Sequence, residues 1–197
     1  MAAGASRRMK GIKQLLPWKN SNFLLETIRT AKESNADSVY VVLGANAETI
    51  MSECNLQEKD TTVFLNPNWS LGLGNSIAFG VKKLIESSSL ADGILICLAD
   101  QPLLSTTYLD SLISNFKKDS SKIIATNYKN RVGVPALFPK LLYPKLVLLE
   151  GDQGAKELLN VSYDEMVQLD PGLQSIDIDT KLEYNQLIQE TNLKNED

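Results

Sequence analysis

MAAGASRRMKGIKQLLP, residues 1–17, is the stretch around which the rest of the chain is organised. Its first residues are small, so backbone N–H groups can approach an anion without interference from side chains. Four cations, Arg7, Arg8, Lys10 and Lys13, follow closely and can neutralise the charge of such an anion. The stretch favours a loop that grips a polyphosphate. Composition alone leaves a second interpretation open, a frayed terminus followed by a solvated basic face.

The composition of the whole chain limits its class. With 197 residues, 43% of them hydrophobic, the chain can bury one sizeable core, and we expect a single domain over residues 1–190 with a flexible tail over residues 191–197. The formal charge of −4 argues against nucleic acid as a partner. The sequence has no signal-type start and no apolar run of about 18 residues, which predicts a cytoplasmic protein without membrane contact.

Histidine is absent from the sequence. This absence excludes Ser-His-Asp and Cys-His hydrolases and zinc sites built on imidazole. Phosphoryl and nucleotidyl transfer stays open, because it depends mainly on positioning and charge neutralisation. Of the two cysteines, Cys97 is expected to be a buried small hydrophobe and Cys54 a half-buried helix residue, with no disulfide or metal framework.

Helical and strand patterns alternate through the first two thirds of the chain. Alternation with short connections predicts an α/β sandwich with a mostly parallel sheet. We expect helices over residues 22–34 (with Ser21 near the N-cap), 47–54, 76–86 and 106–117, and strands over residues 39–43, 62–65, 93–99 and 122–127.

The pattern changes after Tyr128. Residues 134–138 predict an antiparallel strand, because Pro135 would be poorly tolerated in a central one. The elements expected after it are a helix opened by residues 151–154, short strands over residues 166–169 and 175–178, and a last helix whose capping box is formed by Thr180 and Glu183.

The spacing within residues 1–17 resembles a known signature. Ala2-Ala3-Gly4-x-Ser6-x-Arg8-Met9, then Lys13-x-Leu15-Leu16-Pro17, looks like the loop of nucleotidyltransferases related to molybdenum cofactor cytidylyltransferase, which carry L-A-A-G-x-S-x-R-M-G and then K-x-L-L-P. Lys10 replaces a glycine of that pattern. Met1 replaces its leucine, and the strand that leads into the loop in the family is missing or truncated. Either the true start lies upstream or another segment fills the gap, since the neighbouring backbone needs a partner.

A second glycine-rich stretch extends the resemblance. Asn66-Pro67-Asn68-Trp69, with Gly72 and Ser76, matches N-P-x-W-x-x-G-x-x-x-S-I, a loop that lines the base and ribose pocket in the family. Taken alone, its glycines could simply permit a turn. Ser76 is expected to open a helix and contact the base. Trp69 is expected to pack within the protein instead of stacking on a base.

Acidic residues mark a candidate metal site. Asp100 in Leu98-Ala99-Asp100-Gln101-Pro102 follows a buried strand, and Mg²⁺ prefers one or two carboxylates plus phosphate oxygens. Asp100 could instead be the N-cap of a turn. In the family, L-A-D-Q-P binds the metal, so the resemblance implies Mg²⁺ on Asp100. The stretch 175–180 is similar to D-I-D-T-P-E-D-Y, which returns a second acid, and Asp177 and Asp179 share one face of the predicted strand.

Two further matches concern the second substrate. Residues 133–135 and 151–154 are similar to family segments that shape the acceptor side of the cleft. Gly154, expected at a helix start, would offer N–H groups to a phosphate of the acceptor. Both segments could equally be ordinary turns.

The resemblance implies a Rossmann-like three-layer αβα nucleotidyltransferase fold with a small antiparallel part. It also implies Mg²⁺-dependent transfer of CMP from CTP to the phosphate of molybdopterin, with or without its metal, and release of pyrophosphate. Ala3 favours CTP over GTP, because relatives that use GTP carry glycine there. Two alternatives stay open: transfer to another phosphorylated small molecule, and a non-catalytic factor that holds molybdenum cofactor for a molybdenum hydroxylase apoenzyme.

The residues that match the family motifs are the expected site residues. They are Arg8, Lys13 and Asp100 for catalysis; Ala2, Ala3, Gly4, Ala5, Ser6, Gly44, Asn66, Gly72 and Ser76 for the nucleotide; Gly133, Pro135, Asp152 and Gly154 for the acceptor; and Asp100, Asp177 and Asp179 for the metal.

Overall fold

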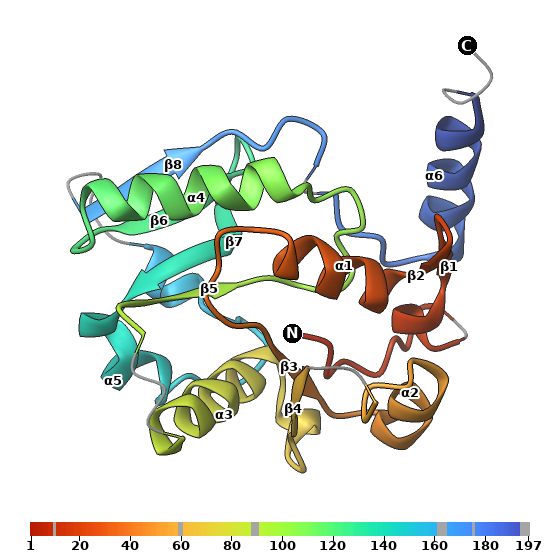
Figure 1. The fold of residues 1–197 in the computed structure, drawn as a ribbon, viewed down its shortest axis with the longest axis horizontal. Helices are drawn as coiled ribbons and strands as arrows, with labels where there is room; N and C mark the ends of the chain where they lie inside the picture. The colour runs from red at the N-terminus through yellow and green to blue at the C-terminus, as the bar shows by residue number, and fades with distance from the viewer. Residues whose placement is uncertain (10, 59–60, 88–90, 161–164, 175, 194–197) are drawn as a thin grey trace.

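A computed structural model describes residues 1–9, 11–58, 61–87, 91–160, 165–174 and 176–193 (Figure 1). Two of the sheets among the described residues carry the longer strands. β3 (Tyr40–Leu43) pairs in parallel with β4 (Thr62–Leu65). The second group has the order β5-β7-β6-β8, in which β7 runs antiparallel to both neighbours while β6 and β8 are parallel. These four strands are β5 (Gly93–Ile96), β6 (Ile123–Asn127), β7 (Val132–Pro139) and β8 (Met166–Leu169).

The first residues of the chain join the two groups of strands. The Met1 amine donates to the Cys97 carbonyl at 2.7 Å, and the Ala99 N–H donates to the Met1 carbonyl at 3.0 Å. On the other side, the Ala2 N–H donates to Val42 at 2.9 Å. The strand that leads into the loop in the family, which we expected to be missing or truncated, is reduced to a single bridge between Ala2 and Leu43.

The helices cover both faces of the four-stranded sheet. α3 and α5 lie on one side of β5 and α4 on the other (Figure 1). The alternation of β6 shows the same division, since Ile123 and Ala125 pack in the cluster of α3 and α5 while Ile124 packs against α4. Three layers are thus present, as expected. The helices are α1 (Phe23–Lys32), α2 (Ala47–Glu53), α3 (Leu73–Glu86), α4 (Thr106–Lys118), α5 (Tyr143–Leu146) and α6 (Lys181–Leu193).

Short elements complete the chain. They are the two-residue strands β1 (Pro17–Trp18) and β2 (Ser21–Asn22), which pair with each other, and the 3₁₀ turns Lys13–Leu15, Trp69–Leu71, Lys140–Leu142 and Lys156–Leu159. No helix in the described part of the chain is both long enough and apolar enough to cross a membrane.

Several predicted boundaries are wrong. α1 runs from Phe23 to Lys32, not over residues 22–34; Ser21 lies next to the N-cap, as expected, and the cap is Asn22, whose side chain accepts from the Leu25 N–H at 2.9 Å. α3 begins at Leu73, so Ser76 lies inside the helix and does not open it. Ser76 is buried, and its hydroxyl donates back to the Gly72 carbonyl, four residues earlier, at 3.2 Å. Cys54 is fully buried, not half-buried.

The strand that contains Pro135 is antiparallel, as predicted, but it is central. β7 lies between β5 and β6. Its register against β6 shifts at Ala125 and Thr126, which leaves Val134 and Pro135 outside the ladder. A bulge tolerates proline because the missing N–H has no ladder partner there. The Thr126 hydroxyl donates to the Pro135 carbonyl at 2.6 Å instead.

The C-terminal part also departs from expectation. Residues 176–179 form no strand, and Ser175 lies outside the described residues. The helix expected after residues 151–154 is the 3₁₀ turn Lys156–Leu159. The capping box is confirmed, because the Thr180 N–H donates to Glu183 at 2.7 Å and the Glu183 N–H donates to the Thr180 hydroxyl at 3.3 Å. α6 continues to Leu193, into the expected tail, and residues 194–197 lie outside the described part.

Candidate active site

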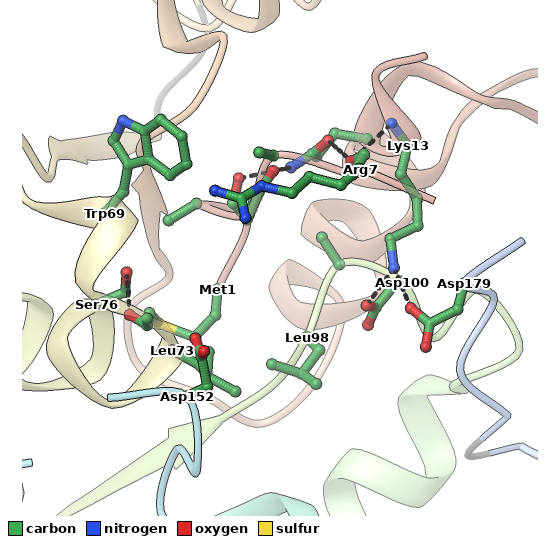
Figure 2. A pocket seen from close by; sticks show the side chains of 18 of the residues that line it. Met1, Arg7, Lys13, Trp69, Leu73, Ser76, Leu98, Asp100, Asp152 and Asp179 are labelled. Atoms are coloured by element: carbon green, nitrogen blue, oxygen red, sulfur yellow. Dashed lines mark hydrogen bonds and ion pairs between the residues drawn. The ribbon is translucent and has the colours of Figure 1, made fainter. Parts of the chain in front are cut away.

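A cavity of about 400 Å³ opens where the N-terminal loop meets the end of β5 (Figure 2). Most of the residues expected to bind nucleotide and metal contribute to its wall. It is lined by Met1, Ala2, Ala3, Gly4, Ala5, Ser6, Arg7, Arg8, Lys13, Gln14, Trp69, Ser70, Gly72, Leu73, Ser76, Leu98, Ala99, Asp100, Asp152 and Asp179.

Gln14 holds the N-terminal loop in shape. Its side chain is buried, and its amide N–H₂ donates to the carbonyls of Ala2 at 2.8 Å and Gly4 at 3.0 Å. Its amide oxygen accepts from the Ser6 hydroxyl at 3.2 Å, and that hydroxyl accepts from the Lys13 N–H at 3.1 Å. Because Gln14 engages the carbonyls, the loop can present other backbone groups to the cavity. Sequence reasoning missed this residue, since glutamine usually lies at the surface.

Two carboxylates meet one ammonium at the floor of the cavity. The Lys13 Nζ lies 2.7 Å from an Asp100 oxygen and 2.8 Å from an Asp179 oxygen (Figure 2). Asp179 also accepts from Arg8 at 2.7 Å. The Ile178 N–H donates to the Asp100 carbonyl at 3.0 Å, and this bond brings the segment before α6 beside the end of β5. Residues 87 and 171 positions apart thus share one ionic cluster.

The pKa shifts follow from these contacts. Burial lowers the pKa of Lys13, but the charge and hydrogen bond of Asp100, and then those of Asp179, outweigh it and raise the pKa overall. Burial raises the pKa of Asp179, yet the hydrogen bond and charge of Lys13, followed by Arg8, lower it overall. At neutral pH Lys13 is therefore an ammonium and Asp179 a carboxylate.

Arg7 and Trp69 are cavity residues that sequence reasoning did not select. Arg7 is exposed, and its guanidinium has no acidic partner among the described residues. In Figure 2 it points away from Asp100 and Asp179 toward the side where Trp69 lies. Trp69 also packs, since a Cβ on Gly44 would lie 2.3 Å from the Trp69 Cβ. The basic run could have identified Arg7, but sequence does not say which arginine faces inward.

The residues expected around the nucleotide divide into two groups. The loop residues 2–6, Gly72 and Ser76 line the cavity, whereas Gly44 and Asn66 do not. Asn66 is buried and its amide donates to Ser76 at 3.1 Å, so it connects the end of β4 to α3. Gly72 has φ +108°, and a Cβ there would lie 2.4 Å from the Gly151 backbone. Only glycine fits this approach between two loops.

Among the residues expected on the acceptor side, only Asp152 lines the cavity. Gly154 faces the Leu73 side chain, which a Cβ would approach to 2.9 Å. Gly133 packs against Tyr128, and Pro135 lies in the bulge of β7. Close packing against neighbouring side chains accounts for glycine at positions 133 and 154, so no bound ligand is needed to explain these residues.

Asp177 lies apart from the cavity, although Asp179 lines it. It accepts from Gln101 at 2.8 Å and pairs with Arg131 at 3.3 Å. Burial, and then the nearby charge of Asp100, raise the pKa of Asp177. The two acids do not share one face as predicted, because residues 176–179 do not form a strand.

Asp100 and Asp179 are the residues that could hold a metal ion. One Asp100 oxygen pairs with Lys13, while the other is buried and has no hydrogen-bond partner. A buried, unpartnered carboxylate oxygen suits a hard cation. No group of three or more His, Cys, Asp or Glu in the described residues could hold an ion by itself. Two carboxylates fit Mg²⁺ when phosphate oxygens complete its coordination.

Comparisons with curated proteins find relatives along most of the chain. Over 193 residues the chain is 31% identical to the purine catabolism protein PucB of Bacillus subtilis (strain 168), covering 94% of this chain and 92% of that protein. Over 168 residues it is 29% identical to the nicotine blue oxidoreductase of Paenarthrobacter nicotinovorans, covering 81% and 78%.

Solved structures share the fold. Rv0371c from Mycobacterium tuberculosis H37Rv superposes with a TM-score of 0.77 at 26% identity, covering 95% of both chains. A structure of that protein in complex with manganese superposes with a TM-score of 0.71 at 24% identity, covering 95% of this chain and 94% of that one.

The family comparison covers most of the sequence. The model of the MobA-like NTP transferase domain matches residues 1–168, which include the N-terminal loop, the glycine-rich loop before α3 and Asp100. With this match, the three-layer fold and the cavity between loop and sheet, the chain belongs to the MobA-like NTP transferase family and is a nucleotidyltransferase.

Proposed function

We propose that the protein transfers CMP from CTP to the phosphate of molybdopterin, with or without its metal, and releases pyrophosphate. The observation that carries the proposal is the meeting of the N-terminal loop, Lys13 and Asp100 at one cavity. The assignment of CTP and molybdopterin depends on the motif resemblance and on the family match.

The loop would hold the triphosphate. Its small residues leave backbone N–H groups accessible, and Arg7, Arg8 and Lys13 line the same wall. Charge builds up on the pyrophosphate as the bond to the α-phosphate breaks, and fixed cations stabilise that charge. The acceptor phosphate is ionised at neutral pH, so no general base is needed, in keeping with a chain that lacks histidine.

The metal would lie on Asp100 and Asp179. When bound, Mg²⁺ would neutralise negative charge on the phosphate oxygens. The three basic and three acidic side chains that line the cavity balance one another, so a triphosphate adds negative charge without compensation from the protein. We propose Mg²⁺ as the cofactor for this reason, and Asp177 as a residue that orients Gln101 beside it.

The nucleotide base would lie between Trp69 and the start of α3. Trp69, Gly72 and Ser76 line that side of the cavity, and an indole offers a face on which a base can stack. Ala3 is buried in the loop, so its methyl group narrows the site. One methyl group discriminates by about 1–3 kcal/mol, which favours CTP with GTP as the weaker substrate.

The test is pyrophosphate release from purified protein with molybdopterin, Mg²⁺, and either CTP or GTP. Turnover with CTP is the expected result. Asp100→Asn should lower kcat by about 10²–10³-fold, roughly 3–4 kcal/mol of transition-state stabilisation. Asp119→Asn is a matched control, because Asp119 pairs with Lys122 at the end of α4 and does not line the cavity.

Other outcomes separate the alternatives. Turnover with a different phosphorylated acceptor, and none with molybdopterin, would support the nucleotidyltransferase activity and contradict molybdopterin as the acceptor. Tight binding of molybdenum cofactor without pyrophosphate release would indicate a factor that delivers cofactor to a molybdenum hydroxylase. Near wild-type turnover of folded Asp100→Asn would contradict the metal assignment.

A further inference from the structure

Lys13 sits between the two carboxylates proposed to hold the metal. Its Nζ lies 2.7 Å from Asp100 and 2.8 Å from Asp179, and its side chain is only 14% exposed. An ammonium at hydrogen-bond distance from one oxygen of each carboxylate repels a second cation that approaches the same pair. One oxygen of each proposed metal ligand is therefore already paired with an internal cation.

The charges of the cluster show what would move this lysine. Lys13 and Arg8 together balance Asp100 and Asp179, so the cluster attracts a divalent cation only weakly. A triphosphate on the adjacent loop would present several negative charges to the same ammonium. Lys13 belongs both to that loop segment and to the cavity wall, and its unbranched side chain can turn from carboxylate to phosphate.

Arg7 provides the first contact for the incoming anion. It is the cavity cation without an acidic partner among the described residues, whereas Arg8 and Lys13 are both engaged. A triphosphate can therefore bind the loop and Arg7 before any ion pair of the cluster breaks. Once the ammonium has left, the unpartnered oxygen of Asp100 is available as a further ligand for the metal ion.

We propose that Lys13 closes the metal site until nucleotide draws its ammonium to the phosphates, so that the metal and the nucleoside triphosphate bind with positive coupling. The proposal rests on the proposed function, because it takes Asp100 and Asp179 as the metal ligands. Its physical advantage is that the free enzyme does not hold a divalent cation in an unproductive position.

Binding of Mn²⁺ alone tests the proposal, measured by electron paramagnetic resonance without nucleotide. Wild-type protein should bind Mn²⁺ weakly, and Lys13→Met should bind it at least about tenfold more tightly, or about 1.4 kcal/mol. Lys13→Gln should behave in the same way. Lys13→Arg keeps the positive charge and should bind as weakly as the wild type. Lys83→Met, which removes the lysine of an exposed pair with Glu86 outside the cavity, is the matched control and should also match the wild type.

A double variant locates the bound ion. Adding Asp100→Asn to Lys13→Met should abolish the gain. Equal Mn²⁺ affinity of wild type, Lys13→Met and Lys13→Gln would overturn the inference, as would equally tight binding by Lys13→Arg. This readout does not use turnover. A negative molybdopterin assay would therefore not contradict the inference about Lys13. A negative Mn²⁺ assay would not contradict the proposed transferase activity, which the pyrophosphate assay tests separately.

Discussion

Asp100 shows how much one residue depends on its surroundings. Its position after a buried strand was predicted from sequence, but its partners Lys13 and Asp179 come from distant parts of the chain. The same applies to Arg7 and Arg8, neighbours with opposite roles. Both line the cavity, but Arg8 is paired with Asp179, while Arg7 has no acidic partner among the described residues. Adjacent residues on a loop point in different directions, so adjacent arginines need not share a function.

Arg7→Ala should raise KM for CTP by about 10–100-fold and change kcat less. A hydrogen bond to a charged group contributes about 1.5–3 kcal/mol, and the inferred role of Arg7 is to capture the triphosphate before the chemical step. Steady-state kinetics of pyrophosphate release measures both constants. Arg29→Ala is the control, since Arg29 pairs with Glu26 on α1 and does not line the cavity. An unchanged KM in Arg7→Ala would contradict the role.

The ends of helices and strands determine where the site lies. The N-terminal loop reaches the sheet because Ala2 bonds to β3 and Met1 bonds to the end of β5. α3 starts three residues earlier than predicted because a bend at Gly72 lets the chain turn directly into the helix. The sequence could not reveal this, since the bend is defined by its close contact with Gly151.

Gln14→Ala should lower the free energy of unfolding by about 1–3 kcal/mol, because the buried carbonyl of Ala2 and the more exposed carbonyl of Gly4 lose their donor. It should also raise KM for CTP, since the loop loses the contact that shapes it. Urea denaturation and steady-state kinetics measure the two effects. Gln189→Ala, at an exposed position of α6, should do neither. Wild-type stability of Gln14→Ala would show that the loop is held by other contacts.

The whole molecule decides the state of the two cysteines. Cys54 is buried between α1 and α2. Cys97 is only partly buried, not buried as predicted, but the removal of its thiol from water raises the pKa of that thiol to about 11. At pH 8 only about one Cys97 in a thousand would be the reactive thiolate. We expect neither thiol to react quickly with Ellman's reagent in the folded protein and both to react in guanidinium chloride. Rapid modification of one thiol under native conditions would be inconsistent with this burial.

The ionic cluster also ties together distant segments, and its contribution to stability should depend on pH. The pKa of Asp179 is lowered on folding, so its contribution is present above the unfolded value of 3.8 and is lost as pH falls through the lower folded value. The pKa of Lys13 is raised, so its contribution is present below 10.5 and is lost only above that pH. Both contributions should be constant between about pH 5 and 9.

Urea denaturation of wild type and Asp179→Asn tests this pH window. The wild type should be more stable by a constant margin from pH 5 to 9, and the margin should shrink below pH 3.8. A stability difference between wild type and Asp179→Asn that changes between pH 6 and 8 would show that other groups cause the pH dependence.

Sequence and tertiary structure decided different properties of this protein. Periodicity and turn residues are local, so they determined the alternation of helices and strands and the capping box of α6. They also placed Asp100 after a strand, although β5 ends at Ile96 and not at Ala99 as predicted. Motif spacing determined the nucleotidyltransferase fold. Only the tertiary structure decided that β7 is central, that Asp179 and not Asp177 reaches the cavity, and that Lys13 lies between two carboxylates. These depend on packing between segments far apart in the chain, and no local pattern encodes which distant partner each side chain will meet.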